Sequence, residues 1–167
     1  MLTEDELDLL RSVEKRVTNP RARTTTKARH EQLNYDLVSV DRKYRFRLFT
    51  RQSLVINDGF SCGIQLIRNN ASIMLARYNG ADHAHVNSLD GTKFAPHCHI
   101  HIATPEYIEA GRRPEGYAEI TTRYTDLNGA FNCLITDWNI TGLKSRRVSA
   151  LEDLIVESNL SLFDSQK

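Results

Sequence analysis

Apolar and polar residues alternate with a period of two in several segments of this chain, and this spacing predicts β-strands. In the segment that begins at Lys43, the apolar members are Tyr44, Phe46 and Leu48, and the basic members are Lys43, Arg45 and Arg47. Because successive side chains of a strand point to opposite faces, this segment should place one side on the core and expose a cationic side. Residues 61–68 and 72–78 predict a hairpin across Asn69-Asn70, and residues 97–103 predict a further strand.

Other segments follow the helical period. The first contains Thr3 and Glu6, which are spaced as a capping box, and its apolar stripe consists of Leu7, Leu10, Val13 and Val17. Asn19-Pro20 should end this helix. A second stripe runs from Leu127 to Trp138 and should cover the apolar side of the sheet. A last helix is expected to start at Ser149.

These elements together predict a single α+β domain over residues 1–160, with a curved antiparallel sheet of four to six strands and helices packed on one side. The stretch near residues 20–33 is basic and lacks periodicity, so we expect a loop or mobile arm there. Residues 161–167 are expected to form a frayed tail. The length of 167 residues fits one domain rather than two.

The composition is that of an ordinary globular protein, with 40% apolar and 26% charged residues. The first ten residues are acidic and do not resemble a signal peptide, and no apolar run is long enough to span a bilayer. Three cysteines, none of them in a CxxC pair, fit a reducing compartment better than a disulfide framework. We therefore expect a cytoplasmic protein without a membrane partner.

Basic residues concentrate in the first third of the chain, although the net charge is only +1. Twelve Lys and Arg residues but only four acidic residues lie between Arg11 and Arg51. Such a block is either a candidate phosphate-binding face or a solvated surface with a disordered arm. The candidate nucleic-acid-binding residues are Arg21, Arg23, Lys27, Arg29, Lys43, Arg45 and Arg47. The exposed cationic strand could also pair with a second copy of the chain and form a homodimer.

Five of the six histidines crowd into one short stretch of the chain. They are His83, His85, His97, His99 and His101. Because histidine is costly to bury unpaired, this crowding points to a functional site. Within residues 97–103, the apolar residues Cys98, Ile100 and Ile102 should point inward, so the three histidines of that segment should share the opposite face.

Three interpretations of the histidines remain open. In the first, they cleave RNA without a metal or other cofactor: one imidazole takes the proton of the ribose 2′-OH, another protonates the leaving 5′-oxygen, and an arginine stabilises the charge that develops on the phosphorus centre. The candidate catalytic residues are His83, His85, His97, His99, His101 and Arg77. His99 and His101 lie roughly 7 Å apart along a strand, and this separation could flank a phosphate.

In the second interpretation, alternate histidines of the strand and a third ligand bind a divalent metal such as Zn²⁺, Fe²⁺ or Ni²⁺. Asp82 or Asp90 could supply a carboxylate. In the third, the histidines are structural or form a recognition surface, with Asp82 and Asn87 hydrogen-bonding His83 and His85.

The run from Tyr78 to Ala103, followed by FNCLITDWNI, resembles a bacterial protein family whose mechanism is not assigned. Its members carry a histidine-containing loop with Asn and Asp-Gly, then a Pro-His-x-His strand, then a helix that ends in a Cys-Asn-Ile-like segment. The matching segments are Asp82-His83, Asp90-Gly91, Pro96-His97-Cys98-His99 and, loosely, residues 137–140. The resemblance covers residues 60–142 and implies His83, His97 and His99 as the motif histidines, whereas His85 and His101 depart from the pattern.

A weaker similarity is to TumE-type toxins of bacterial toxin–antitoxin pairs, which also have clustered histidines. The two resemblances imply a small bacterial or phage-borne protein whose partner is an antitoxin or a host protein. The sequence as a whole thus predicts a toxin–antitoxin-type RNA-cleaving protein with RNA as its partner. The alternatives are a non-enzymatic phage- or plasmid-encoded protein that binds nucleic acid or a host defence complex, and a His-ligated metal-dependent enzyme.

Overall fold

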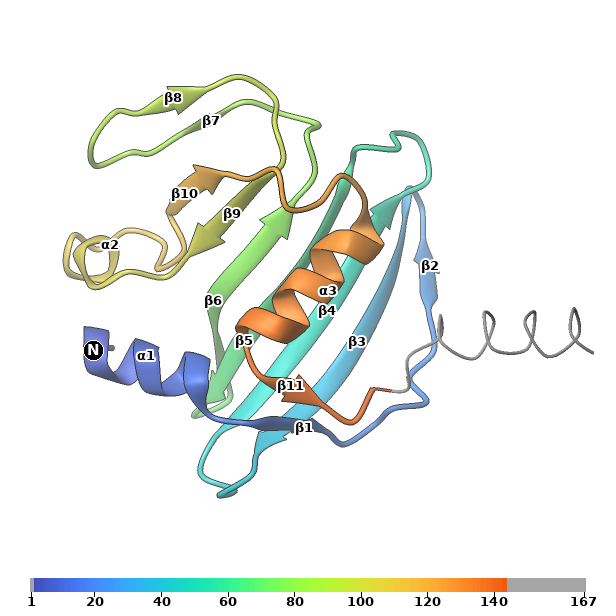
Figure 1. Cartoon of the computed structure of the whole chain (residues 1–167), viewed down its shortest axis with the longest axis vertical. Helices are drawn as coiled ribbons and strands as arrows, with labels where there is room; N and C mark the ends of the chain where they lie inside the picture. Colours follow the sequence, from blue (N-terminus) through green and yellow to red (C-terminus); the bar gives the residue numbers. More distant parts are fainter. Residues whose placement is uncertain (1, 144–167) are drawn as a thin grey trace, which may run out of the picture.

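A large, open β-sheet dominates the computed structural model, which describes residues 2–143 (Figure 1). Nine strands form it in the order β10-β9-β6-β5-β4-β3-β1-β11, with β2 beside β3. Their bounds are β1 (Lys15–Val17), β2 (Thr25–Lys27), β3 (His30–Ser39), β4 (Arg45–Ser53), β5 (Phe60–Arg68), β6 (Ala71–Asn79), β9 (His99–Ile102), β10 (Tyr117–Ile120) and β11 (Ile140–Thr141). The short hairpin of β7 (His85–Val86) and β8 (Lys93–Phe94) forms a separate two-stranded sheet. The helices are α1 (Glu4–Ser12), α2 (Pro105–Glu109) and α3 (Leu127–Asp137).

The predicted α+β class holds in outline, because 40% of the described residues are strand and 18% are helix. The predicted number of four to six strands is too low. The sheet is also mixed rather than purely antiparallel, since β1 pairs with β11 in parallel. Strands β1, β2, β10 and β11 contain two to four residues each, too few to show a period of two. The ten-residue β3 was also not predicted, although Leu33, Tyr35 and Leu37 alternate in it.

The expectation of a loop or mobile arm near residues 20–33 is wrong for its second half. Thr25–Lys27 forms β2 and pairs with the first residues of β3 in a tight hairpin. The side chains of β2 are all exposed, so no apolar residue marks it in the sequence. Tertiary pairing along β3, rather than local pattern, orders this segment.

The first helix begins as predicted and ends early. The capping box is present, because the Thr3 hydroxyl accepts from the Glu6 N–H and the Glu6 carboxylate accepts from the Thr3 N–H. The helix nevertheless stops at Ser12, and Val17 is buried as part of β1 rather than of a helical stripe. Val13 and Val17 are four residues apart. This spacing fits one face of a helix, but it equally fits one face of a strand.

Lys15 explains why the chain turns from helix to strand at this point. Its side chain is fully buried, and its ammonium group donates to the carbonyl oxygens of Arg11 (3.1 Å), Val13 (2.7 Å) and Trp138 (2.7 Å). The same ammonium lies 5.2 Å from the centre of the Phe46 ring. Lys15 thereby ties the end of α1 to the end of α3 through backbone carbonyls that no helix hydrogen bond satisfies.

The two broad faces of the sheet differ in chemistry. Helix α3 crosses one face, where Ala130 and Leu134 pack into the apolar core (Figure 1). On β4, Phe46 and Leu48 point to this face, whereas Arg45 and Arg47 are exposed on the other, as the alternation predicted. The helix therefore covers only the apolar side, and a polar face is left on the opposite side.

The central hairpin of β5 and β6 also matches its prediction. Asn69 and Asn70 link the two strands, and both have positive φ angles, 52° and 61°. Two consecutive residues of this kind are typical of the type I′ turn that joins twisted strands.

Among the helices of residues 2–143, none is long and apolar enough to cross a membrane. The helix expected from Ser149 and the tail expected at 161–167 lie outside the described residues.

The burial of Lys15 predicts a pH-dependent contribution to stability. Burial lowers the pKa of Lys15 from 10.5 to about 7, so the unfolded chain binds one more proton than the folded chain between these values. Stability then rises with pH through this window. Lys15→Met leaves three carbonyls without a donor, which should lower the free energy of unfolding by about 2 kcal/mol at pH 7. The variant also lacks the rise in stability that the wild type shows above pH 7, so its deficit should be larger at pH 9. Urea unfolding at both pH values measures the difference. Lys27→Met, at an exposed strand position, should change stability little, and equal losses for the two variants would contradict this role of Lys15.

Candidate functional site

The histidines of strand β9 are buried, whereas the opposite face of the strand borders an open pocket. On the α3 side, Ile100 and Ile102 line a pocket of about 500 Å³ together with Tyr78 and Trp138. On the opposite side, His99 and His101 are 0% and 4% exposed. The predicted division into an isoleucine face and a histidine face is confirmed, but the histidines are the more deeply buried set. The chain segment that contains β7 and β8 covers His99 and His101.

Asn87 attaches this covering segment to the edge of the main sheet. Its side-chain amide donates to the Ala118 carbonyl (3.1 Å) and its side-chain oxygen accepts from the Ala118 N–H (2.9 Å). Asn87 is 2% exposed and takes the place of a strand neighbour along β10. A second contact joins the Leu89 N–H to the hydroxyl of Tyr107 at 3.4 Å. These bonds hold His85 over β9.

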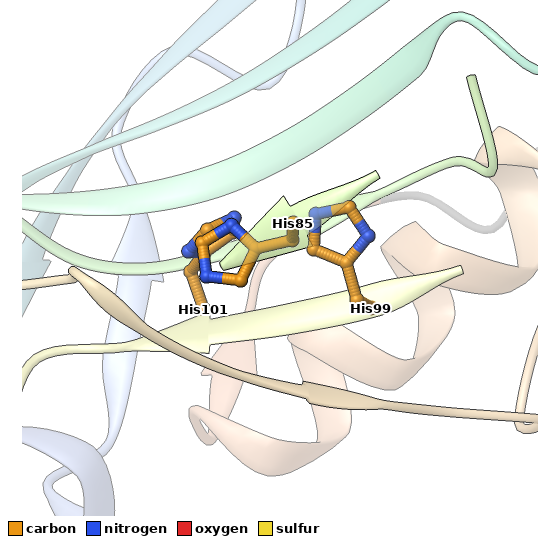
Figure 2. Close-up of side chains that lie close together, drawn as sticks. All are labelled: His85, His99 and His101. Atoms are coloured by element: carbon orange, nitrogen blue, oxygen red, sulfur yellow. The ribbon is translucent and has the colours of Figure 1, made fainter. Parts of the chain in front are cut away.

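His85, His99 and His101 converge in the space between β7 and β9 (Figure 2). The ring centroids lie 4.7 Å apart for His85 and His101, 5.0 Å for His99 and His101, and 5.7 Å for His85 and His99. One nitrogen of each ring can be chosen so that all three lie within 4.8 Å of one another. We call these three residues the histidine triad.

The partners of the triad fix which nitrogen of each ring carries the proton. Nδ1 of His99 lies 2.8 Å from the His97 carbonyl, and Nδ1 of His101 lies 3.0 Å from the Glu115 carbonyl. A carbonyl only accepts, so both Nδ1 atoms donate. Nε2 of His85 lies 3.0 Å from the Asn87 side-chain oxygen and donates to it. In the neutral rings, the lone pairs of His85 Nδ1 and His101 Nε2 have no hydrogen-bond donor within residues 2–143, whereas His99 Nε2 accepts from the Asn79 amide at 3.2 Å.

Burial keeps the two histidines of β9 uncharged. It lowers the pKa of His101 to about 3, with Arg77 and the other two triad histidines adding to the effect. It lowers the pKa of His99 as well, against a smaller opposite effect of the bond to the His97 carbonyl. Both rings are therefore neutral near pH 7, as ligands of a metal ion must be.

Several buried polar atoms around the triad have no hydrogen-bond partner within residues 2–143. They are Nε2 of His101, the side-chain oxygen of Asn79 and Nε of Arg77. Asn79 instead donates through Nδ2 to His99 Nε2 at 3.2 Å. Arg77 stands directly opposite His101 in the pairing of β6 with β9. Buried groups without partners are uncommon, and a water molecule or a ligand bound here would satisfy them.

The structure separates the other two predicted histidines from the triad. His83 lies at its border, with its ring 5.2 Å from that of His99, and its Nδ1 is 2.6 Å from the Asp82 carboxylate. Its side chain is 51% exposed. His97 is exposed and its Nδ1 donates to the Ala95 carbonyl, so it contributes only its own backbone oxygen, which accepts from His99.

The predicted cationic residues fall into two groups. Arg45, Arg47 and Lys27 lie on the polar face of the sheet, as the strand pairing shows. The remaining ones occupy turns and loops and are Arg21, Arg23, Arg29 and Lys43. Arg51 was missed as a candidate although it follows Arg47 at the spacing that keeps it on the same strand face. Asn79 was missed as a site residue, because a lone asparagine carries no signal in the sequence. The bonds that the third interpretation expected are present, between Asn87 and His85 at 3.0 Å and between Asp82 and His83 at 2.6 Å. The bonds from Asn87 to Ala118 were not expected.

No protein-family model, curated protein or solved structure matches this chain. The resemblances to the bacterial histidine-loop family and to TumE-type toxins stay predictions.

Replacing Asn87 should loosen the covering segment. Asn87→Ala leaves the N–H and carbonyl of Ala118 without partners and should cost about 2 kcal/mol. Hydrogen exchange of the Ala118 amide should accelerate more than tenfold, as followed by NMR or mass spectrometry. Asn132→Ala, at an exposed position of α3, is the matched control and should leave this amide unchanged. Unaltered exchange in Asn87→Ala would show that other contacts hold the segment.

Proposed function

We propose that His85, His99 and His101 bind one divalent transition-metal ion and that the chain is a metal-dependent enzyme. The observation that carries this proposal is the hydrogen bonding of the three rings. Each ring donates one N–H to a carbonyl or amide oxygen, and its other nitrogen carries a lone pair, which on His99 accepts from the Asn79 amide and would have to be released to a metal ion. This is the usual way in which proteins orient histidine ligands and fix their tautomers.

The distances are compatible with a metal after a small adjustment. The three ligand nitrogens lie within 4.8 Å of one another. A tetrahedral zinc ion, with bonds of about 2.1 Å, holds its nitrogen ligands about 3.4 Å apart. Each ring therefore has to move inward by under about 1 Å, which a change in side-chain torsion angles can supply. Three neutral imidazoles suit Zn²⁺, Fe²⁺, Co²⁺ or Ni²⁺ better than the hard ions Mg²⁺ and Ca²⁺.

Three protein ligands favour a catalytic site over a structural one. Structural zinc sites are closed by four protein ligands, whereas three leave a position for water, whose pKa the ion lowers to about 7. His83, whose ring lies 5.2 Å from that of His99, is half exposed and hydrogen-bonded to Asp82, and it would exchange a proton with a group that reacts at the metal. Arg77 supplies a positive charge from the facing strand.

The metal-free cleavage of RNA, as in the predicted toxin, is the second candidate. It requires one imidazole that is charged near neutral pH and acts as the general acid. His99 and His101 are poorly suited to this role because burial favours their neutral form. Only His83, the exposed member at the border of the triad, has the access to water that such an acid needs. The toxin, the antitoxin partner and the binding of a host defence complex remain proposals that growth arrest on expression would test.

Metal analysis separates the two candidates. Protein purified without a nickel column and without a histidine tag should contain about one equivalent of a transition metal by mass spectrometry. A concentration of that metal a hundredfold above Kd should stabilise the fold by about 2.7 kcal/mol. Both His99→Ala and His101→Ala should abolish binding, whereas His97→Ala, the neighbouring histidine outside the triad, should bind as the wild type does.

The far-ultraviolet circular dichroism of each variant checks that a loss of metal is not a loss of fold. If His85→Ala, His99→Ala and His101→Ala stay folded and bind metal as tightly as the wild type, the triad is not a metal site.

An RNA-cleavage assay provides an independent test of the chemistry. Cleavage of a labelled RNA should stop in EDTA and return when the metal identified above is restored. His83→Gln should retain the metal and lower kcat about a hundredfold, because it removes proton transfer and not the ion. Cleavage that persists in EDTA and depends on His83 would favour the metal-free candidate instead.

A further inference from the structure

A pocket of about 300 Å³ lies on the polar face of the sheet, beside the histidine triad. It spans strands β3 to β6, and the residues that matter for its chemistry are Arg47, Phe49, Arg51, Ser61, Gln65 and Arg77. Three of them are arginines, and no carboxylate lines the pocket. We infer that this pocket binds the phosphate group of a nucleotide and presents it to the metal site proposed above, on which the inference rests.

The arginines are largely free to bind an anion. Arg47 has one carboxylate nearby, that of Asp36 at 3.7 Å, and both side chains are at least half exposed. Such an exposed pair contributes little. Arg51 contacts only a neutral group, the side-chain oxygen of Gln32, at 3.4 Å. Nε of Arg77 has no partner within the described chain. Planar guanidinium groups bind phosphate oxygens through two parallel N–H groups, and this geometry favours phosphate over a single point charge.

One aromatic residue, Phe49, lines the pocket, and it is 9% exposed. It lies across the neighbouring strand, and a Cβ atom added to Gly63 would be only 2.7 Å from its ring and 2.7 Å from the Ala76 carbonyl. The glycine thus makes room for the ring to lie against the sheet.

Arg77 connects the pocket to the triad. It stands opposite Gly63 on one side, where the Phe49 ring lies, and opposite His101 on the other. Adjacent strands are about 4.8 Å apart, so a phosphate that contacts Arg77 lies within reach of the triad. A phosphate bound in the pocket would contact the guanidinium group of Arg77, beside the triad.

Cations beyond the pocket indicate that the nucleotide belongs to a chain. Arg45 and Lys27 lie on the same face of the sheet, outside the pocket lining. A mononucleotide would not reach them, whereas a single strand of several nucleotides could place further phosphates there. We therefore expect an oligonucleotide to bind more tightly than a mononucleotide with the same base.

Binding of labelled uridine hexanucleotide, measured by fluorescence anisotropy in EDTA to prevent turnover, tests the pocket. Uridine monophosphate serves as the competitor. The substitutions Arg51→Ala and Arg77→Gln should each weaken hexanucleotide binding about tenfold and reduce the slope of log K against log salt by about 1. Arg112→Ala, an exposed arginine after α2, should bind as the wild type does.

The outcomes distinguish this inference from the metal proposal. Arg51→Ala should keep its full metal content, because it lies outside the triad, while His99→Ala should lose metal and keep hexanucleotide affinity in EDTA. If Arg51→Ala and Arg77→Gln both fold and bind the hexanucleotide as tightly as the wild type, the pocket is not a phosphate site, and the metal proposal is unaffected. The phosphate site is also rejected if the wild type binds neither the hexanucleotide nor the monophosphate. Equal affinity for the two ligands would overturn the expectation of a nucleic-acid chain and keep that of a phosphate.

Discussion

The structure depends on the burial of the histidine face of β9. A buried strand face normally carries apolar residues, because an imidazole without a partner is costly to bury. Here the backbone satisfies the histidines: His99 and His101 each donate to a carbonyl from outside the strand ladder. These two bonds consume one nitrogen of each ring. The other nitrogen of His101 has no partner within the described residues, and that of His99 accepts from the Asn79 amide. A metal ion would use the lone pairs of all three rings once the Asn79 amide is displaced.

Local signals in the sequence predicted the parts of the fold that local rules determine. The β5–β6 hairpin follows from alternation around two asparagines, and the start of α1 follows from its capping box. The histidine face of β9 also followed from alternation, but its depth of burial did not. That depth depends on the bond between Asn87 and Ala118, which are 31 residues apart. No pattern of period two or 3.6 encodes such a contact, and the asparagine that makes it looks like an ordinary loop residue.

The site itself was predicted only in part, because tertiary contacts position some of its side chains. Sequence reasoning placed three histidines on one strand face, but β9 begins only at His99, so His97 belongs to the preceding loop. The third ring of the triad, His85, comes from β7, where tertiary contacts position it. The arginine pocket shows the converse case. Arg51 lies on the same strand face as Arg47, and extending the strand predicted from Lys43 by two further alternate positions, Phe49 and Arg51, would have included it.

The apolar side of the sheet also determines the geometry of the polar side. The Tyr124 hydroxyl lies 3.1 Å from the Asn79 carbonyl and 2.9 Å from the His99 carbonyl, and so fixes the ends of β6 and β9 together. On β6, Tyr78 donates to the Asp137 carboxylate of α3 at 2.6 Å. Neighbouring residues of a strand point to opposite faces, so anchoring Tyr78 on the helix side sets the direction of Arg77 on the other. The site is therefore held from behind, by rigid strands packed on α3, and its side chains need little further ordering when a ligand binds.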